Sequence, residues 1–302
     1  MFVIFGAAGN VGRVTAAALR RAGREVRAVV RNEQQGKLLA EIGCGVAIAD
    51  LLDPSTVERA IEGATAVQIL CPLPREGADP ASTMRRMIDV SAAVLRANPP
   101  QRVLALSDYG AEHAEGTGIT TLFHHLETQL APLASPLTQL TFLRAAEHMH
   151  NWARVLPVVL ARGVLPSLHQ PLNKLFPTVA AQDVGLLAAE LLLDDRSVKV
   201  SPRVVSIEGA ERISALEVAR TFGALTQREI AAREVPRGEW VALLRGAGLG
   251  ERHARLIVDL YDAHNAGRIE VETQISERRF GTTAAVDVFA SLLPHVAAAT
   301  AR

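Results

Sequence analysis

The sequence predicts an α/β fold in which helices cover both faces of a doubly wound parallel sheet. Three observations support this prediction: a short apolar strand ends in a glycine-rich turn, a helix follows the turn, and strand-like and helix-like segments then alternate. A helix between two strands returns the chain to the starting edge of the sheet, so the strands that it connects run parallel. The expected strands are residues 1–5, 25–30, 46–50, 66–71, 102–107, 137–143 and 203–207.

The turn after the first strand has the form of a dinucleotide-binding turn of the Rossmann type. Gly6 permits a tight exit from the strand, Gly9 leaves no side chain between backbone and pyrophosphate, and Gly12 lets the next helix pack on the sheet. The N-terminus of that helix would direct its unpaired N–H groups at the phosphates. The expected cofactor contacts here are Gly6, Ala8, Gly9, Asn10, Val11 and Gly12. The alternative is an ordinary βαβ turn that binds nothing.

Arg31 follows the second strand, where such folds bind the adenosine ribose. Domains that prefer NAD usually carry an acidic residue there, which holds the ribose 2′-OH. An arginine can instead bind a 2′-phosphate with two parallel hydrogen bonds. We therefore expect NADP(H) to be preferred over NAD(H), with a solvated surface arginine as the alternative.

The third and fourth strands end in further candidate cofactor contacts. Asp50 and Leu51 would flank the adenine, although Asp50 could equally cap the next helix. Cys71, Pro72 and Leu73 leave the fourth strand at the same edge, and Cys71 is expected to be a small buried packing residue rather than a nucleophile. The helices expected between these strands are 33–42, 56–62 and 84–97.

The fifth and sixth strands end in the residues expected to surround the substrate. Ser107 would contact the cofactor, and Asp108 and Tyr109 would line the pocket where nicotinamide and substrate meet. The other expected pocket residues are His148, Asn151 and Trp152, which follow the sixth strand.

Histidines supply the candidate acids. Six of the nine lie within residues 113–169, and histidine exchanges protons near neutral pH. His124 or His125 would protonate the product or hydrogen-bond the nicotinamide ribose. A metal site is not expected, because no cluster of carboxylates or cysteines accompanies His148 and His150.

The chain divides into two regions. Residues 1–152 are expected to form the NAD(P)-binding domain, and residues 178–210 to return to it. Residues 153–302 would mainly form a smaller, mostly helical lobe that binds the substrate. Beyond residue 151 the expected helices are 152–161, 178–193, 213–222, 237–246, 251–266 and 286–299, the last four typical of a small C-terminal lobe, with a loop at 166–177.

Composition argues against several other classes of protein. Lys plus Arg and Asp plus Glu both total 32, so there is no electrostatic case for binding nucleic acid or an anionic membrane. No apolar run approaches the length of a membrane span, and no signal-peptide pattern is visible. Two cysteines cannot form a disulfide framework. We expect a cytoplasmic protein that binds a small molecule; the oligomeric state stays open.

Taken together, these motifs resemble the NmrA-like branch of the atypical short-chain dehydrogenases. The resemblance rests on Gly6 to Gly12, Arg31, Asp50-Leu51 and Ser107, and it extends to segments 143–151, 182–185, 206–209 and 260–267. It implies a parallel sheet flanked by helices, NADP in the crevice at the carboxyl ends of the strands, and a substrate lobe over it.

The sequence departs from the wider pattern at the proton-transfer pair. Catalytic short-chain dehydrogenases use Tyr-x-x-x-Lys, in which the lysine lowers the pKa of the tyrosine. Here Tyr109 is followed four residues later by His113, and Lys37, Lys174 and Lys199 all lie outside the segment between strands five and six. Tyr109 is therefore not expected to be an essential proton donor.

Two functions remain open. The first is an NADPH-dependent oxidoreductase acting on a small electron-poor substrate, quinone-like or conjugated, which needs positioning more than strong acid catalysis. The second is a non-catalytic NADP-sensing regulator that acts through a protein partner. The missing Tyr-Lys pair favours the regulator, and the histidine-rich pocket favours the enzyme. A hydrolase is not expected, since Ser107 does not lie in a G-x-S-x-G turn.

Overall fold

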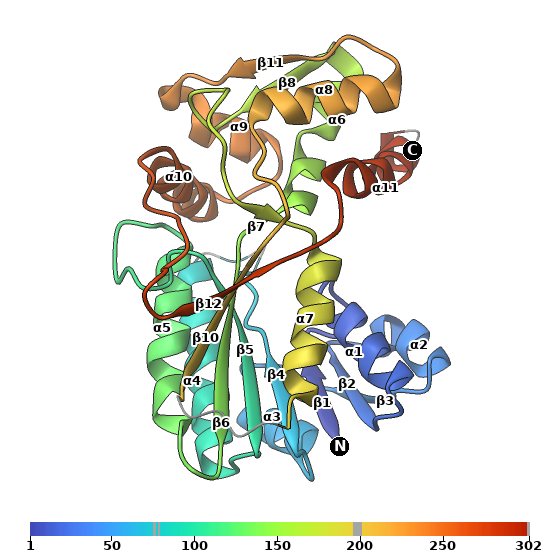
Figure 1. Ribbon diagram of the computed structural model, residues 1–302, viewed down its shortest axis with the longest axis vertical. Helices are drawn as coiled ribbons and strands as arrows, with labels where there is room; N and C mark the ends of the chain where they lie inside the picture. The colour runs from blue at the N-terminus through green and yellow to red at the C-terminus, as the bar shows by residue number, and fades with distance from the viewer. Residues whose placement is uncertain (75–76, 78, 196–200, 301–302) are drawn as a thin grey trace.

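The computed structural model describes residues 1–74, 77, 79–195 and 201–300, and a parallel sheet of eight strands forms its centre (Figure 1). The strand order is β12-β10-β6-β5-β4-β1-β2-β3, and each strand is parallel to its neighbours. The strands are β1 (Phe2–Phe5), β2 (Val26–Val30), β3 (Gly45–Ile48), β4 (Ala66–Ile69), β5 (Arg102–Asp108), β6 (Gln139–Ala145), β10 (Arg203–Glu208) and β12 (Ser276–Phe280). The predicted doubly wound α/β fold is confirmed.

Helices cover both faces of the sheet (Figure 1). One layer contains α1 (Gly12–Arg21), α2 (Glu33–Glu41) and α7 (Ala181–Leu193), and the other contains α3 (Pro54–Ile61), α4 (Pro80–Ala97) and α5 (Thr120–Leu130). In β1, Phe2 and Ile4 pack in the first layer and Val3 and Phe5 in the second, because side chains alternate along a strand. Burial on both faces is why this strand reads as an uninterrupted apolar run.

Strand β12 is the one strand of the main sheet that the sequence did not predict. Three of its five residues are charged, and it lies at the edge of the sheet, where its side chains form ion pairs rather than a core. Glu277 pairs with Arg203, and Arg278 pairs with Glu208, both on the neighbouring β10. Charged edge strands carry no apolar pattern, so periodicity does not reveal them.

The remaining elements gather beyond one end of the sheet (Figure 1). The helices there are α6 (Leu156–Arg162), α8 (Ala215–Thr226), α9 (Trp240–Gly246), α10 (Glu251–Asn265) and α11 (Ala285–Thr300). They pack with two short parallel strands, β8 (Val164–Ser167) and β11 (Ala231–Glu234), around two hydrophobic clusters of their own. The segment expected to be a loop from residue 166 therefore begins inside β8.

Two more short strands join the regions. β7 (Glu147–His148) pairs in parallel with β9 (Thr178–Val179). The helix expected from residue 178 consequently begins only at Ala181, after β9. Among the described helices, none is both long and apolar enough to cross a membrane.

Candidate functional site

The glycine turn between β1 and α1 is closed by its own backbone. The Gly9 N–H donates to the Gly6 carbonyl at 2.9 Å, and Gly6 has a φ of +68°, which glycine adopts without strain. A Cβ at Gly12 would lie 2.3 Å from the Gly6 carbonyl oxygen, but a Cβ at Gly9 would lie 3.2 Å from it. Packing therefore requires Gly12, whereas exposed Gly9 could accept a side chain after a small adjustment.

The start of α1 has the features of an anion site. In this described part of the chain, no side chain caps the helix N-terminus and no acidic residue lies in its first turn. The N–H groups of Arg13 and Val14 donate to the carbonyls of Gly9 and Val11, at 3.1 Å and 3.0 Å, and the helix dipole favours negative charge at this end. The neighbouring turn residues Ala8 and Asn10 are exposed, while Val11 is buried beneath them.

Helix α7 packs against this turn. A Cβ at Gly185 would lie 2.7 Å from the Val11 carbonyl oxygen, so a glycine there lets α7 pack directly against the start of α1. In the same return segment, β10 pairs with β6. Residues far along the chain thus hold the N-terminal turn in place.

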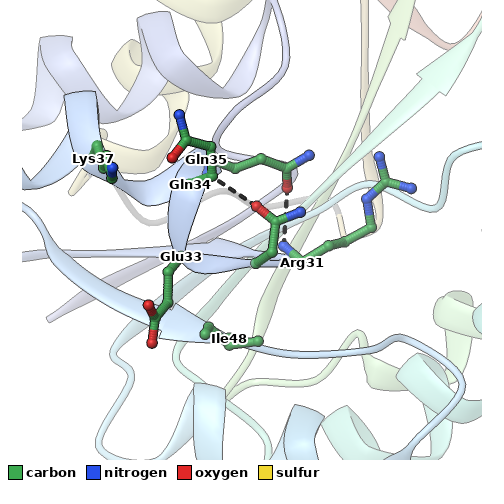
Figure 2. Close-up of a pocket in the computed structure, with 7 residues that line it drawn as sticks. Arg31, Glu33, Gln34, Gln35, Lys37 and Ile48 are labelled. Carbon is green, nitrogen blue, oxygen red and sulfur yellow. Dashed lines mark hydrogen bonds between the residues drawn. The ribbon is translucent and has the colours of Figure 1, made fainter.

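Arg31 lies directly after β2 on the rim of an open depression, which is lined by residues 31–35, Lys37 and Ile48. Figure 2 shows its guanidinium extending away from α2, while its backbone N–H donates to Gln35 Oε1 at 3.2 Å. Among the described residues the guanidinium makes no hydrogen bond or ion pair. The carboxylate of Glu33 points away from it (Figure 2). Arg31 is therefore an exposed cation that has no counter-ion in the described part of the chain.

Asp50, at the end of β3, is exposed and stabilises its own turn. Its Oδ1 accepts the Leu52 N–H at 2.9 Å. The cap of α3 is instead Asp53, which accepts the Ser55 N–H at 3.0 Å. Leu51 beside it is half-buried. Asp53, and not Asp50, therefore caps the helix. Asp50 remains exposed after β3, where it could contact the adenine.

The residues after β4 present backbone rather than reactive side chains. Cys71 is completely buried, and burial raises the pKa of its thiol to about 12. Its Sγ lies 3.9 Å from Ser91 Oγ in the layer of α4. Pro72 is exposed and Leu73 is half-buried. Cys71 is a packing residue, so any contact with a cofactor would come from its backbone.

Ser107 lies at the carboxyl end of β5 and is fixed by a buried ion pair. Its hydroxyl donates to Glu127 Oε1 at 2.6 Å. Glu127, on α5, also accepts two hydrogen bonds from Arg144 of β6, at 2.9 Å and 2.7 Å. Arg144 completes its contacts with Glu112 at 3.0 Å and Glu272 at 2.6 Å. Four separate segments therefore determine the position of one hydroxyl group.

Asp108 is the last residue of β5 and is half-buried. Its Oδ2 accepts a hydrogen bond from Thr120 Oγ1, at the start of α5, at 3.1 Å. Burial raises the pKa of the carboxyl to about 7, and the negative charges of Glu147 and Glu112 add to this effect against the Thr120 hydrogen bond. Asp108 thus changes charge near neutral pH.

Tyr109 lies elsewhere than expected. It is only 1% exposed and packs in the layer of α7, on the opposite face of the sheet from Glu127. The reason is that β5 ends at Asp108, so the alternation of the strand stops before Tyr109. The structure places the ring in the core rather than in a pocket beside Ser107, and burial raises the pKa of its hydroxyl well above the usual range.

The two candidate acids on α5 have different surroundings. His124 is half-buried, and its Nδ1 lies 2.9 Å from the Ala111 carbonyl, in the loop after β5. His125 lies 2.8 Å from Asp89 of α4, on the outer side of the helix. Because Glu127 is three residues after His124, these two share one face of α5, and His125 is turned away from it. The structure brings only His124 near the end of β5.

The residues after β6 divide between the start of α1 and the core of the lobe. His148 is half-buried, and burial together with the charge of His150 lowers its pKa to about 4. Burial and then the charge of Arg13 lower the pKa of His150, so this segment lies near the start of α1. Asn151 is half-buried and accepts a hydrogen bond from Arg154. Trp152 is in the core of the lobe, 6.3 Å from the ring of Phe176.

A buried polar cluster around Glu147 was not expected from the sequence. Its carboxylate lies 2.8 Å from His169 Nε2 and accepts a hydrogen bond from Tyr261 at 3.0 Å. Burial raises the pKa of Glu147, but the charge and hydrogen bond of His169 outweigh it and lower the pKa to about 2. The His169 ring stacks on Phe176 at 3.5 Å. The cluster joins β7 to the lobe helix α10, and no local pattern could have paired these residues.

The fold and this edge of the sheet define a Rossmann-like α/β protein. The model of the NmrA-like family matches residues 1–279, and the chain therefore belongs to that family. This confirms the resemblance found in the sequence. No curated protein matches the sequence significantly.

Solved structures share the fold over almost the whole chain. Triphenylmethane reductase of Citrobacter sp., in its complex with NADP(H), is 17% identical with a TM-score of 0.79 and covers 97% of this chain and 100% of its own. An NADPH-dependent quinone oxidoreductase of Escherichia coli, complexed with NADPH, is 17% identical with a TM-score of 0.78 and the same two coverages. Leucoanthocyanidin reductase of Vitis vinifera, with NADPH, is 12% identical with a TM-score of 0.71, covering 97% of this chain and 99% of its own.

Proposed function

We propose that this protein is an NADPH-dependent reductase of small electron-poor molecules. The observation that carries the proposal is an open glycine turn at the start of α1, together with the Arg31 guanidinium after the next strand; among the described residues, no side chain caps the helix and none pairs with the guanidinium. The turn fits a pyrophosphate, and Arg31 fits a 2′-phosphate. The triphenylmethane reductase and the quinone oxidoreductase, which share the fold, were solved with NADP(H) and NADPH.

The other end of the crevice supplies the positioning groups. A bound nicotinamide would supply hydride near the carboxyl ends of β4 and β5. The Ser107 hydroxyl donates a hydrogen bond to Glu127, so its oxygen remains able to accept a hydrogen bond from a ligand. His124 lies on the same face of α5 as Glu127, near the loop after β5, which supports it as the histidine that would hold the cofactor ribose. The C-terminal lobe would exclude water above this edge.

The proposed substrate class rests on the missing tyrosine–lysine pair and on the polar residues near the ends of β5 and β6. Without a Tyr-x-x-x-Lys pair, the protein suits acceptors whose reduced form is a stabilised anion, such as quinone-like or conjugated molecules. Asp108 and His148 would make one side of the pocket polar. No nucleic acid or metal is needed for this chemistry, and cytoplasmic location is part of the proposal.

Two measurements on the purified protein test the proposal. Calorimetric titration should show NADPH binding more tightly than NADH, and NADPH oxidation should be detected with some members of a panel of quinones, cationic dyes and enones. Equal affinity for both cofactors would contradict the assignment of Arg31. Tight NADPH binding with no acceptor reduced would instead support the cofactor-sensing regulator, which should then show an NADPH-dependent protein partner.

A further inference from the structure

We infer that the carboxyl group of Asp108 is the proton donor in this reduction. The inference rests on the proposed function and adds a residue role that the usual tyrosine–lysine pair fills elsewhere. Ser107 and Asp108 are consecutive at the carboxyl end of β5, where the reacting part of the cofactor would lie. Of the two, Asp108 is the group that can exchange a proton.

Asp108 is held in place by its neighbours and is still partly exposed. The residue ends a strand that is hydrogen-bonded on both sides, by β4 and by β6, and pairs in register with Ala145. The hydroxyl of Thr120, the first residue of α5, donates to one carboxyl oxygen. The residue is half-buried, so part of its surface is exposed to solvent. A fixed but accessible acid is what proton transfer to a bound acceptor requires.

Burial and then the neighbouring negative charges raise the pKa of this carboxyl toward neutral pH. Glu147 on β7 and Glu112 in the loop after β5 both raise its pKa. Arg144 of β6 binds Glu127, Glu112 and Glu272, and His169 of the lobe contacts Glu147, so both of these side chains contact carboxylates other than that of Asp108. Burial makes the largest contribution, the charges of Glu147 and Glu112 act in the same direction, and together they outweigh the Thr120 hydrogen bond and raise the pKa of Asp108 to about 7.

The proton and electron balance is simple. The acceptor gains a hydride at one atom, with both electrons from the C–H bond of the reduced nicotinamide, which becomes NADP⁺. The O–H bond of the Asp108 carboxyl breaks, and its proton forms an O–H, N–H or C–H bond on the acceptor. The Asp108 carboxylate then takes a proton from water, so one turnover consumes one NADPH and one solvent proton.

Steady-state kinetics of Asp108→Asn against the unmodified protein test the role. In the unmodified protein kcat/KM should fall as the pH rises through about 7, because the acid must be protonated. Asp108→Asn should lower kcat/KM by about 10²–10⁴ and remove this pH dependence. The loss should be larger for an enone, whose reduced form is a strong base, than for a quinone. Asp195→Asn is the matched control, since Asp195 is 74% exposed and pairs with Arg102 at the opposite end of β5.

A second measurement does not depend on activity. The pKa of the Asp108 carboxyl is raised on folding, so its protonation stabilises the folded protein at low pH, and this stability is lost as the pH rises through about 7. Asparagine mimics the neutral acid, so Asp108→Asn should unfold at higher denaturant concentration than the unmodified protein at alkaline pH but not at acidic pH.

The outcomes separate the two proposals. If the unmodified protein reduces no acceptor, the proposed function fails. If it is active and Asp108→Asn keeps both its rate and the pH profile, with NADPH binding intact, Asp108 is not the donor. His124→Ala showing the loss instead would move the role to that histidine.

Discussion

The two ends of the proposed cofactor crevice each contain an arginine, but the two arginines differ in burial and in their partners. At the adenosine end, Arg31 is exposed and its guanidinium has no partner among the described residues. At the nicotinamide end, Arg144 is only 4% exposed and binds three carboxylates. Both arginines lie at or directly after the carboxyl end of a strand. The guanidinium of Arg31 has no partner among the described residues, whereas that of Arg144 is bound by carboxylates of the protein itself.

Because the two arginines differ in burial, their removal should change different properties of the protein. An exposed charge is solvated and screened by salt, so its removal changes little in the protein alone and is felt mainly when a ligand is bound. A buried charge within a network leaves its partners uncompensated when it is removed. Substitutions at the adenosine end should therefore change affinity, and substitutions at the nicotinamide end should change stability.

The largest expected effect is at Arg144. Arg144→Met should lower the free energy of unfolding by about 3–5 kcal/mol, since it leaves the buried carboxylate of Glu127 without its cation. Denaturant unfolding measures this. Arg252→Ala is the control: Arg252 pairs with Asp79 on the surface and should contribute below about 1 kcal/mol. A loss of similar, small size for both variants would remove the contrast between the two ends.

The next effect concerns the turn between the two ends. Gly9→Val should abolish binding of NADPH and NADH in calorimetry, because the side chain would occupy the pyrophosphate position. The fold should persist, since a Cβ at Gly9 needs only a small shift of the Gly6 carbonyl. Gly238→Val, in the lobe, has open space around its Cβ and should bind normally. Unchanged NADPH binding by Gly9→Val would show that the phosphates lie elsewhere.

The sequence predicted those parts of the molecule whose signal is local. Seven strands of the main sheet are apolar runs, and the glycine turn and Arg31 lie within one βαβ unit, so all were visible without the structure. Strand β12 was missed because its charges pair across the edge of the sheet with residues of β10.

The nicotinamide end was less predictable, because its contacts join distant segments. The bond between Tyr261 and Glu147 spans 114 residues, and that between Arg144 and Glu272 spans 128. Neither pair shows a spacing that a sequence reading can use. Tyr109 illustrates a different limit: one residue beyond a strand end, alternation no longer tells which face a side chain takes.

A moderate effect is expected at Arg31. Arg31→Ala should weaken NADPH binding about ten- to hundredfold, since a charge-assisted hydrogen bond contributes about 1.5–3 kcal/mol. NADH affinity should barely change, and the difference between the cofactors should shrink as salt is added. Arg24→Ala is the matched control, because Arg24 is an exposed arginine before β2 whereas Arg31 follows it. Parallel losses for NADPH and NADH would mean that Arg31 does not contact the 2′-phosphate.

The smallest effect is expected at Tyr109, and it tests whether every buried polar group near this edge belongs to the network. Within the described chain, the Tyr109 hydroxyl is buried without a hydrogen-bond partner. Removing an unsatisfied buried hydroxyl takes away a desolvation penalty and breaks no bond, so Tyr109→Phe should be as stable as the unmodified protein or slightly more stable. The ring, which packs between β5 and the layer of α7, is preserved. The reduction rate should change less than tenfold, in contrast to Asp108→Asn next to it. An inactive Tyr109→Phe protein with normal NADPH affinity would show instead that the tyrosine is the proton donor. The catalytic group would then lie on the face of the sheet that α7 covers, opposite to Glu127 and Arg144.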